Sequence, residues 1–249
     1  MASPAVRTLE SLLLNRKLGA TLTSACDVTR LTPSGVPDLD RVLGGGWRTG
    51  AISEVVGRRS TGRTRVLMAT LAMATRQGQV VALVDAVDRF DPASAASAGV
   101  DLDRLLWVRG PAITMEHGRP PMIDRAIKQA VRACDLIIRA GGFAIVALDL
   151  ADVPPRRVQA LPSGTWLRLA HANEGRETTC LLLGESSMGR SARGVSVQLD
   201  ARTIWTGDSA QARRFGGFDP EFTPRLSGTL APASPAGTLA QAATRDRGW

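Results

Sequence analysis

Two kinds of segment alternate along the chain. Short, continuous apolar runs, typical of strands buried on both faces of a sheet, lie at residues 51–57, 80–86, 143–150 and 178–184. Stretches with apolar residues at helical spacing lie between them, and Gly78 and Gly141 follow two of these stretches as helix-stop signals. The alternation predicts an α/β fold, with a mostly parallel sheet and helices on both of its faces.

The same pattern divides the chain into three parts. Residues 1–30 are expected to form an amphipathic N-terminal helix and a linker, since apolar side chains share one helical face. Those side chains are Val6, Leu9, Leu12 and Leu13. Residues 31–208 carry the α/β pattern, whereas residues 209–249 are rich in Gly, Pro, Ala and Ser and predict a flexible tail. The helical face can fold back on the core or dock on another molecule, and the sequence leaves both open.

Composition narrows the functional classes. The chain has 249 residues and a net charge of +8, with a pI of about 10.9. This charge favours an anionic partner such as nucleic acid and equally fits a basic, solvated surface. The three cysteines and two histidines are widely spaced, so we expect neither a metal cluster nor a disulfide framework. Because no apolar run reaches membrane-spanning length and the N-terminus lacks a signal-peptide core, we expect a soluble, cytoplasmic protein.

The segment from Gly57 to Thr64, GRRSTGRT, matches the phosphate-binding loop G-x-x-x-x-G-K-[ST] except at Arg63, where the pattern has lysine. In such loops backbone N–H groups cradle a phosphate, and an acid at the end of a later strand helps to hold Mg²⁺. The candidate nucleotide-binding residues are Gly57, Arg58, Arg59, Ser60, Thr61, Gly62, Arg63, Thr64 and the strand-end Asp149. Asp85, which ends another run, is interpreted as a capping residue. A plain glycine turn is the alternative, and the loop by itself favours neither.

The wider sequence resembles the RecA family of recombinases from about residue 31 to residue 205. The segments that carry the resemblance are SGVPDLDRVLGGG before the loop, DAVDRFDP and AGVDLDRLL after it, FAIVALDLADVPP, and LLLGESSMGRSARGVSVQLDAR. They follow one another in the family's order and at its spacing. The resemblance implies a RecA-like core with a nucleotide site at the loop and two DNA-binding loops.

Several positions depart from the family's pattern. Arg63 replaces the loop lysine, and a forked guanidinium is not equivalent to a compact ammonium. Val87 stands where the family has its catalytic glutamate, and Ser94 where it commonly stacks an aromatic ring on adenine. Gly184 or Glu185 occupies the region of the glutamine that senses the γ-phosphate. We therefore expect no ATP hydrolysis, no catalytic residue, no metal and no required cofactor, with residual binding of ATP and Mg²⁺ left open.

The resemblance also implies where DNA would bind. The first loop would span about residues 153–162 and the second about residues 186–194. Their candidate DNA-binding residues are Arg156, Arg157, Arg190 and Arg193. Arginines can bind phosphates without sequence preference, but neither loop has an aromatic residue on which bases would stack. An ordinary solvated basic loop is the alternative.

Within the superfamily, the features together resemble one branch, the ImuA family. These bacterial RecA-like proteins work beside ImuB and an error-prone DNA polymerase in damage-induced (SOS) mutagenesis, whereas the related SulA family is shorter. The resemblance implies an accessory role in translesion synthesis through contacts with RecA, ImuB or both, and with the polymerase indirectly. The face formed by Val6, Leu9, Leu12 and Leu13 would dock on such a partner. The alternatives are an active RecA-type, DNA-dependent ATPase and a non-specific DNA-binding module.

Overall fold

The computed structural model describes most of the chain between residues 30 and 226. The described ranges are 30–113, 119–162, 164–189, 191, 193–207 and 214–226. The N-terminal face expected to carry Val6, Leu9, Leu12 and Leu13 lies outside them, as does Arg190. None of the helices in the described ranges is long and apolar enough to cross a bilayer.

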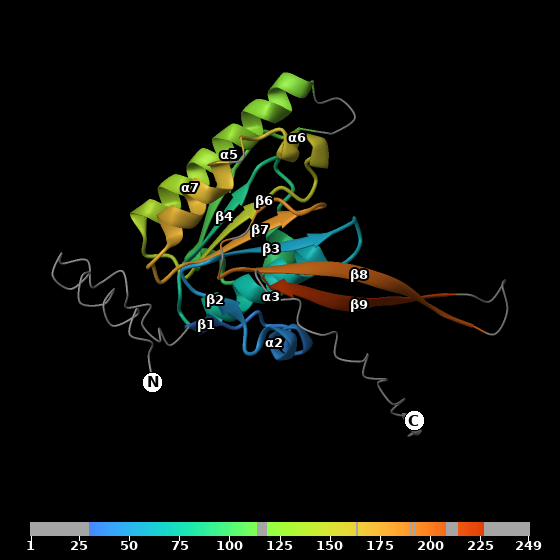
Figure 1. Cartoon of the computed structure of the whole chain (residues 1–249). Coiled ribbons are helices and arrows are strands. Elements are labelled where there is room, and N and C mark those ends of the chain that lie inside the picture. The colour runs from blue at the N-terminus through green and yellow to red at the C-terminus, as the bar shows by residue number, and fades with distance from the viewer. Residues whose placement is uncertain are drawn as a thin grey trace, which may run out of the picture.

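A seven-stranded sheet with the order β5-β4-β6-β7-β3-β8-β9 forms the centre of the molecule (Figure 1). In chain order its strands are β3 (Ile52–Gly57), β4 (Val81–Asp85), β5 (Leu105–Arg109), β6 (Ile145–Asp149), β7 (Thr179–Gly184), β8 (Val195–Thr206) and β9 (Arg214–Leu226). Neighbouring strands run parallel, except that β9 is antiparallel to β8. Two short strands, β1 (Leu31–Thr32) and β2 (Trp47–Arg48), form a separate antiparallel pair. The predicted α/β architecture is confirmed.

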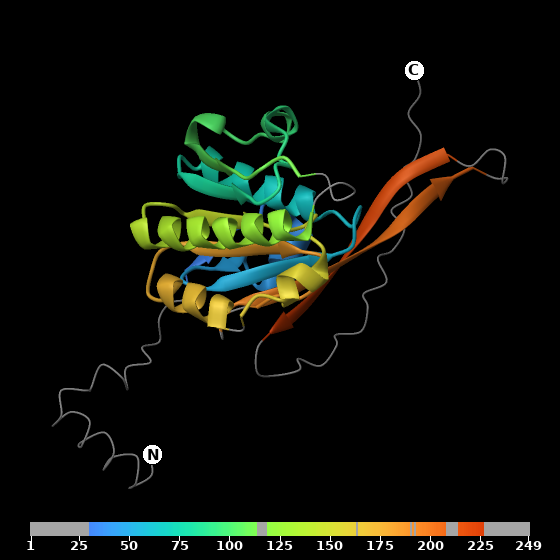
Figure 2. The ribbon, with the colours of Figure 1, turned by 90° about the horizontal axis from the view of Figure 1, so that it is seen from above.

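Helices cover both faces of the sheet because its strands are apolar on both sides. The helices are α2 (Pro37–Leu43), α3 (Arg63–Arg76), α4 (Pro92–Ser97), the 3-10 turn η2 (Leu102–Arg104), α5 (Pro120–Ala140), α6 (Pro155–Gln159) and α7 (Gly164–Asn173). Along β4, Val81 and Leu83 join a core cluster with α3, whereas Ala82 and Val84 join one with α5. Successive strand residues point to opposite faces, so each continuous apolar run contributes to two cores. Seen from above, α5 and α7 lie side by side over the sheet (Figure 2).

The C-terminal part of the described chain differs from the prediction. The composition of residues 209–249 predicts a flexible tail, but Arg214–Leu226 form β9, which pairs with β8 along its length. For β9 the prediction is wrong, because β8 offers an edge of unpaired backbone groups that no local pattern reveals. Phe222 of β9 packs against the core cluster around α3. Together β8 and β9 extend beyond the rest of the sheet as a ribbon (Figures 1 and 2).

Candidate functional site

The candidate phosphate loop lies at the carboxyl edge of the sheet, where ligands bind in parallel α/β folds. A cavity of about 200 Å³ opens there between α3 and the residues that follow β4 and β6. Its lining includes three of the candidate nucleotide-binding residues, Arg63, Thr64 and Asp149. It also includes Val87 and Ser94, two positions at which the sequence departs from the RecA pattern. The cavity is smaller than the roughly 300–1,000 Å³ of most small-molecule sites.

Two glycines permit the turn between β3 and α3. A Cβ at Gly57 would lie 2.5 Å from the Thr61 hydroxyl and 2.8 Å from the Leu199 carbonyl oxygen. Gly62 has a φ of +97°, a conformation that strains any L side chain. The Thr61 hydroxyl donates to the Arg58 carbonyl oxygen at 2.8 Å, which closes the loop on itself. The segment therefore has the strand–turn–helix form of a phosphate-binding loop.

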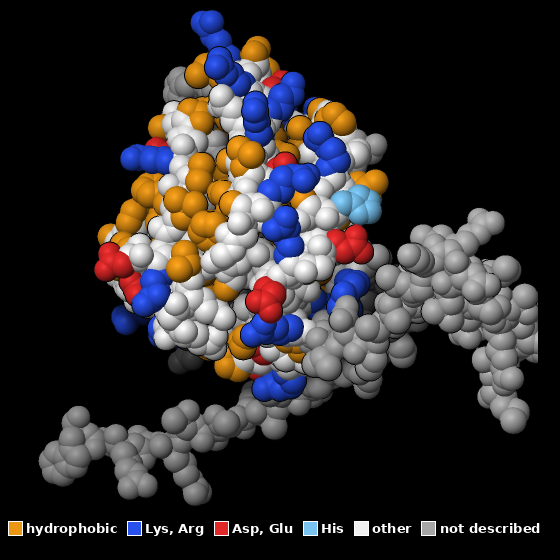
Figure 3. Space-filling model, turned by 90° about the vertical axis from the view of Figure 1, so that its left-hand side faces the viewer, with side chains coloured by type: hydrophobic (Ala, Val, Ile, Leu, Met, Phe, Trp, Pro, Cys, Tyr) orange, Lys and Arg blue, Asp and Glu red, His pale blue; other side chains and the backbone are white. Residues whose placement is uncertain are grey.

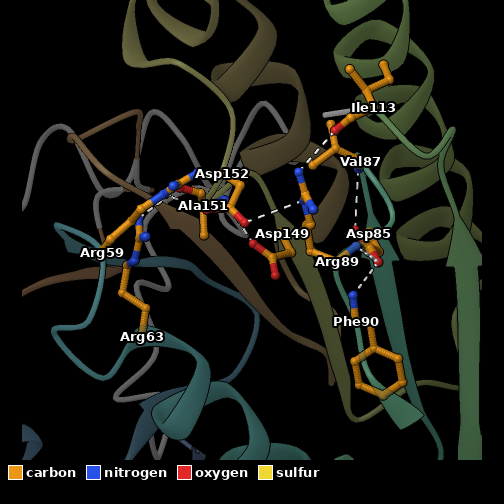
Figure 4. A network of polar contacts seen from close by, with 10 residues as sticks. All are labelled: Arg59, Arg63, Asp85, Val87, Arg89, Phe90, Ile113, Asp149, Ala151 and Asp152. Atoms are coloured by element: carbon orange, nitrogen blue, oxygen red, sulfur yellow. Dashed lines mark hydrogen bonds and ion pairs between the residues drawn. The ribbon is translucent and has the colours of Figure 1, made fainter. Parts of the chain in front are cut away.

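Arg63, in the place of the loop lysine, turns into the protein. The residue is only 6% exposed, and its Nη1 donates a hydrogen bond to the Ala151 carbonyl oxygen at 3.0 Å (Figure 4). Burial lowers the pKa of Arg63, and the carboxylates of Asp149 and Asp152 oppose that shift. A guanidinium stays charged in proteins, so its burial requires partners of this kind.

Asp149, the candidate metal-binding acid, is engaged with the backbone. Its Oδ1 accepts the N–H of Ala151 at 2.8 Å. Burial raises the pKa of Asp149 to about 6, against the opposing effects of that N–H and of Arg63. Thr64 is exposed, and no hydrogen bond of the described structure joins it to Asp149. Over the same described ranges, no three His, Cys, Asp or Glu side chains gather into a metal-binding group.

Asp152 links two further arginines of this edge, Arg59 and Arg89. Its carboxylate lies 3.3 Å from Nε of Arg59 and 3.7 Å from Nε of Arg89 (Figure 4). Arg89 also donates from Nη2 to the Ile113 carbonyl oxygen at 3.2 Å. Arg63 and Arg89, which line the cavity, and Arg59 of the loop are thus paired with groups of the protein itself.

Two acids from the end of β4 and the segment after it, Asp85 and Asp91, line the cavity, and both accept hydrogen bonds from nearby groups of the protein. Asp85 caps the strand end, as the sequence indicates, by accepting the N–H groups of Arg89 at 2.7 Å and Phe90 at 2.8 Å. Val87, at the glutamate position, is buried. The hydroxyl of Ser94 donates to the N-cap carboxylate of α4. The edge of the cavity is therefore apolar or internally bonded where the family has its base.

Asp88, the acid next to Val87, does not line the cavity. Its backbone has a φ of +60°, and its carboxylate accepts two hydrogen bonds from the Arg109 guanidinium at 2.6 and 2.9 Å. Arg109 in turn lies over the Trp107 ring, 5.0 Å from its centre. Asp88 is therefore committed to the edge strand β5 rather than to the phosphate loop.

The candidate DNA-binding arginines are described in part. The first segment contains the short helix α6, on which Arg156 is exposed and Arg157 forms an ion pair with Asp124 of α5 at 3.4 Å. In the second segment Arg193 is exposed, and its carbonyl oxygen accepts a hydrogen bond from Arg48 at 3.5 Å. None of the arginines described in these two segments lines the cavity beside the loop.

Glu54, which the sequence reasoning missed, organises the segment before β8. It lies in the middle of β3 with no exposed surface. Its carboxylate accepts hydrogen bonds from the Ser187 hydroxyl at 2.6 Å and from the N–H groups of Met188 and Gly189 at 2.8 and 3.1 Å. The sequence pattern that could have identified Glu54 is a single acid inside an apolar strand run, because a buried charge requires partners.

An α/β sheet with a strand–turn–helix loop at its carboxyl edge defines a protein with a phosphate-loop-like site. The model of the RecA N-terminal domain family matches residues 15–158, more than half of the chain, so the chain belongs to this family. Protein RecA of Francisella philomiragia is 36% identical over 126 residues, which are 50% of this chain and 31% of that protein. Protein RecA of Francisella tularensis subsp. novicida has the same identity and coverage. The match thus spans about a third of the length of these relatives.

Removing the Glu54 carboxylate should loosen the segment that it holds. We expect Glu54→Ala to lower the free energy of unfolding by about 2–4 kcal/mol, because a fully buried side chain is truncated and its three hydrogen bonds are lost. Hydrogen exchange at the amides of Met188 and Gly189 should accelerate more than exchange in β6. The matched control is Glu185→Gln, an exposed acid, which should change stability by less than about 0.5 kcal/mol. Unchanged exchange at the two amides would show that Glu54 does not position them.

Asp149 should make stability depend on pH. Its pKa is raised in the folded protein from 3.8 to about 6, so the fold favours the protonated acid and the ionised carboxylate destabilises it. The penalty grows as the pH rises from about 4 to about 6 and is constant above that range. We therefore expect Asp149→Asn to match the original protein near pH 4 and to be roughly 1–3 kcal/mol more stable at pH 7.5, measured by denaturant unfolding. A difference that stays constant with pH would contradict this.

Proposed function

We propose that this chain is a RecA-family accessory protein that does not hydrolyse ATP. The observation that carries the proposal is the buried guanidinium of Arg63, bonded to the Ala151 carbonyl oxygen in the place where the family's loop lysine meets phosphate. A lysine presents a compact charge on a flexible stem. Arg63 instead spans the cavity and binds the opposite wall.

The charges around the loop support the same conclusion. Arg59 and Arg89 share the carboxylate of Asp152, and Asp149 lies close enough to oppose the pKa shift of Arg63. A triphosphate placed here would have to break these pairs and would lie beside two acids. Like charges brought together at a partly desolvated site cost free energy. Residual nucleotide affinity is therefore expected to be weak.

The residues at the place of the family's catalytic base also support a site that does not hydrolyse ATP. A hydrolase of this kind needs a group that orients or deprotonates the attacking water. Val87 is apolar and buried, and Asp88 is held by Arg109 on β5. We do not assign a catalytic residue, a metal ligand or a required cofactor.

The particular role that we propose is that of ImuA. This proposal rests on the resemblance of the sequence, with all the features described above taken together, to the ImuA family. In this role the chain would act in damage-induced mutagenesis by contacting RecA, ImuB or both, with the error-prone polymerase reached indirectly. Family membership supports a RecA-type surface. A core that keeps the family's architecture while pairing its own loop charges supports binding rather than turnover.

The accessory role predicts binding to RecA filaments on single-stranded DNA. We expect the full chain to bind such filaments and a variant lacking residues 1–20 to bind at least about tenfold more weakly, since the N-terminal face is the proposed docking element. Biolayer interferometry on immobilised filaments measures both affinities. Equal affinity of the two proteins would remove the docking role, and no binding by the full chain would remove RecA as a partner.

The inactive-site proposal predicts no phosphate release above background, with or without single-stranded DNA. Arg63→Lys should restore a compact charge and a freer cavity, so we expect it to bind a fluorescent ATP analogue at least about tenfold more tightly than the original chain. The matched control is Arg65→Lys, an exposed position on the same helix, which should leave binding unchanged. DNA-stimulated phosphate release that disappears in Asp149→Ala would instead establish an active ATPase.

A further inference from the structure

A groove of about 430 Å³ runs between α5 and α7, away from the phosphate loop. Its floor is apolar and includes Val131, Leu161 and Leu169. Its rim is basic, with Lys128 and Arg132 on α5 and Arg168 on α7. The side of the molecule that α5 and α7 form shows Lys and Arg side chains along a band, with hydrophobic side chains beside it (Figure 3). The groove shares no lining residue with the cavity at the loop.

Two rim residues of α5, Lys128 and Arg132, continue a row that begins at Arg125, outside the groove lining. Arg125, Lys128 and Arg132 follow one another at three and four residues, so they project from one side of the helix. All three are exposed, as is Arg168. No ion pair to any described residue engages these four side chains, because the nearby acids are already used: Asp124 by Arg157 and Asp135 by Arg139. The groove therefore presents cationic groups without a partner in the described chain.

A solvated basic helix face is the simpler explanation, but it does not account for the groove. Exposed lysines and arginines normally extend over a convex surface into water. Here they surround a hollow whose floor is aliphatic, and a hollow of this size lies within the range of roughly 300–1,000 Å³ that takes ligand groups. An apolar floor in a charged rim fits an occupant with an apolar centre and charged flanks.

We propose that this groove binds an acidic peptide segment that carries aliphatic anchor residues. The anchors fill the space over Val131, Leu161 and Leu169, and flanking carboxylates pair with Lys128, Arg132 and Arg168. The aliphatic anchors of such a segment would bury the apolar floor and supply affinity. Its carboxylates would pair with the basic rim and fix its orientation.

Nucleic acid fits the groove less well. Single strands bind proteins by phosphate contacts together with stacking of bases on aromatic rings. No residue that lines the groove is aromatic: the lining is Lys128, Val131, Arg132, Asp135, Arg139, Leu161, Pro162, Thr165, Arg168 and Leu169. Phosphates alone would engage the rim and leave the aliphatic floor uncovered. This inference does not rest on the proposed function, since it holds whether or not the loop binds ATP.

The test uses fluorescence anisotropy of the full chain with a labelled peptide in which two leucines are flanked by glutamates and aspartates. We expect Lys128→Glu and Arg132→Glu each to weaken binding by about five- to tenfold, because each reversal removes one attraction and adds one repulsion. A peptide with serines in place of the leucines should also bind about tenfold more weakly, since it lacks the anchors. Both positions are exposed, so these substitutions should leave the unfolding transition intact.

The matched control is Arg65→Glu, an exposed helical arginine on the opposite face of the sheet. It should leave the affinity within about twofold, as expected for a charge outside the groove. Equal weakening by Arg65→Glu, or equal binding of the serine peptide, would reduce the effect to general charge attraction and overturn the proposal. The proposal would also be overturned if a single-stranded oligonucleotide bound more tightly than the leucine peptide and if Lys128→Glu and Arg132→Glu abolished that binding. The groove would then be a nucleic-acid surface. Failure of the leucine peptide to bind would overturn the proposal directly.

Discussion

A buried guanidinium determines the arrangement at the carboxyl edge of this sheet. Arg63 cannot lose its proton, and it lies almost fully out of water. It donates a hydrogen bond to the Ala151 carbonyl oxygen, and the carboxylates of Asp149 and Asp152 oppose the lowering of its pKa by burial. Asp152 also pairs with Arg59 of the loop and with Arg89, so the loop is connected to the segments that follow β6 and β4. A loop whose charges are paired within the protein supports the proposal of binding without ATP turnover.

A second buried charge connects the same strand to the other side of the site. Glu54 of β3 receives three hydrogen bonds from the segment before β8, while β3 also leads into the loop that carries Arg63. The unit of β3, loop and α3 thus contacts both the cavity at the loop and the segment before β8. The groove between α5 and α7 belongs to the opposite helical layer, where an aliphatic floor and arginines without an ion pair to any described residue allow a different kind of partner.

Much of the fold is readable from the sequence, and the particular contacts are not. Apolar runs give β3, β4, β6 and β7 because both faces of those strands are buried, and Gly62 marks the turn because only glycine adopts its backbone without strain. The partner of Arg63 lies 88 residues away, and the first partner of Glu54 lies 133 residues away. Such pairs depend on the strand order, which local patterns do not carry.

The strand β9 is another feature that the local sequence does not predict. Its glycines and prolines indicate a loop, and only the neighbouring edge of β8 makes it a strand. The candidate site was predictable as a location, since a loop after β3 and an acid after β6 must lie at one edge of a parallel sheet. The inward orientation of Arg63 was not predictable. A lysine-to-arginine change in the sequence does not reveal which group of the cavity the side chain will bind.

The most direct test of the paired-charge site is thermal unfolding with and without millimolar ATP and Mg²⁺. A ligand that binds only the folded state stabilises it by RT ln(1 + L/Kd), where L is the free ligand concentration, about 2.7 kcal/mol at one hundred times its Kd, and so raises Tm. If the paired charges around Arg63 leave only weak affinity for the triphosphate, Tm will change little between samples with and without the nucleotide. A Tm that rises progressively with ATP concentration, and that no longer does so in Asp149→Ala, would contradict the account.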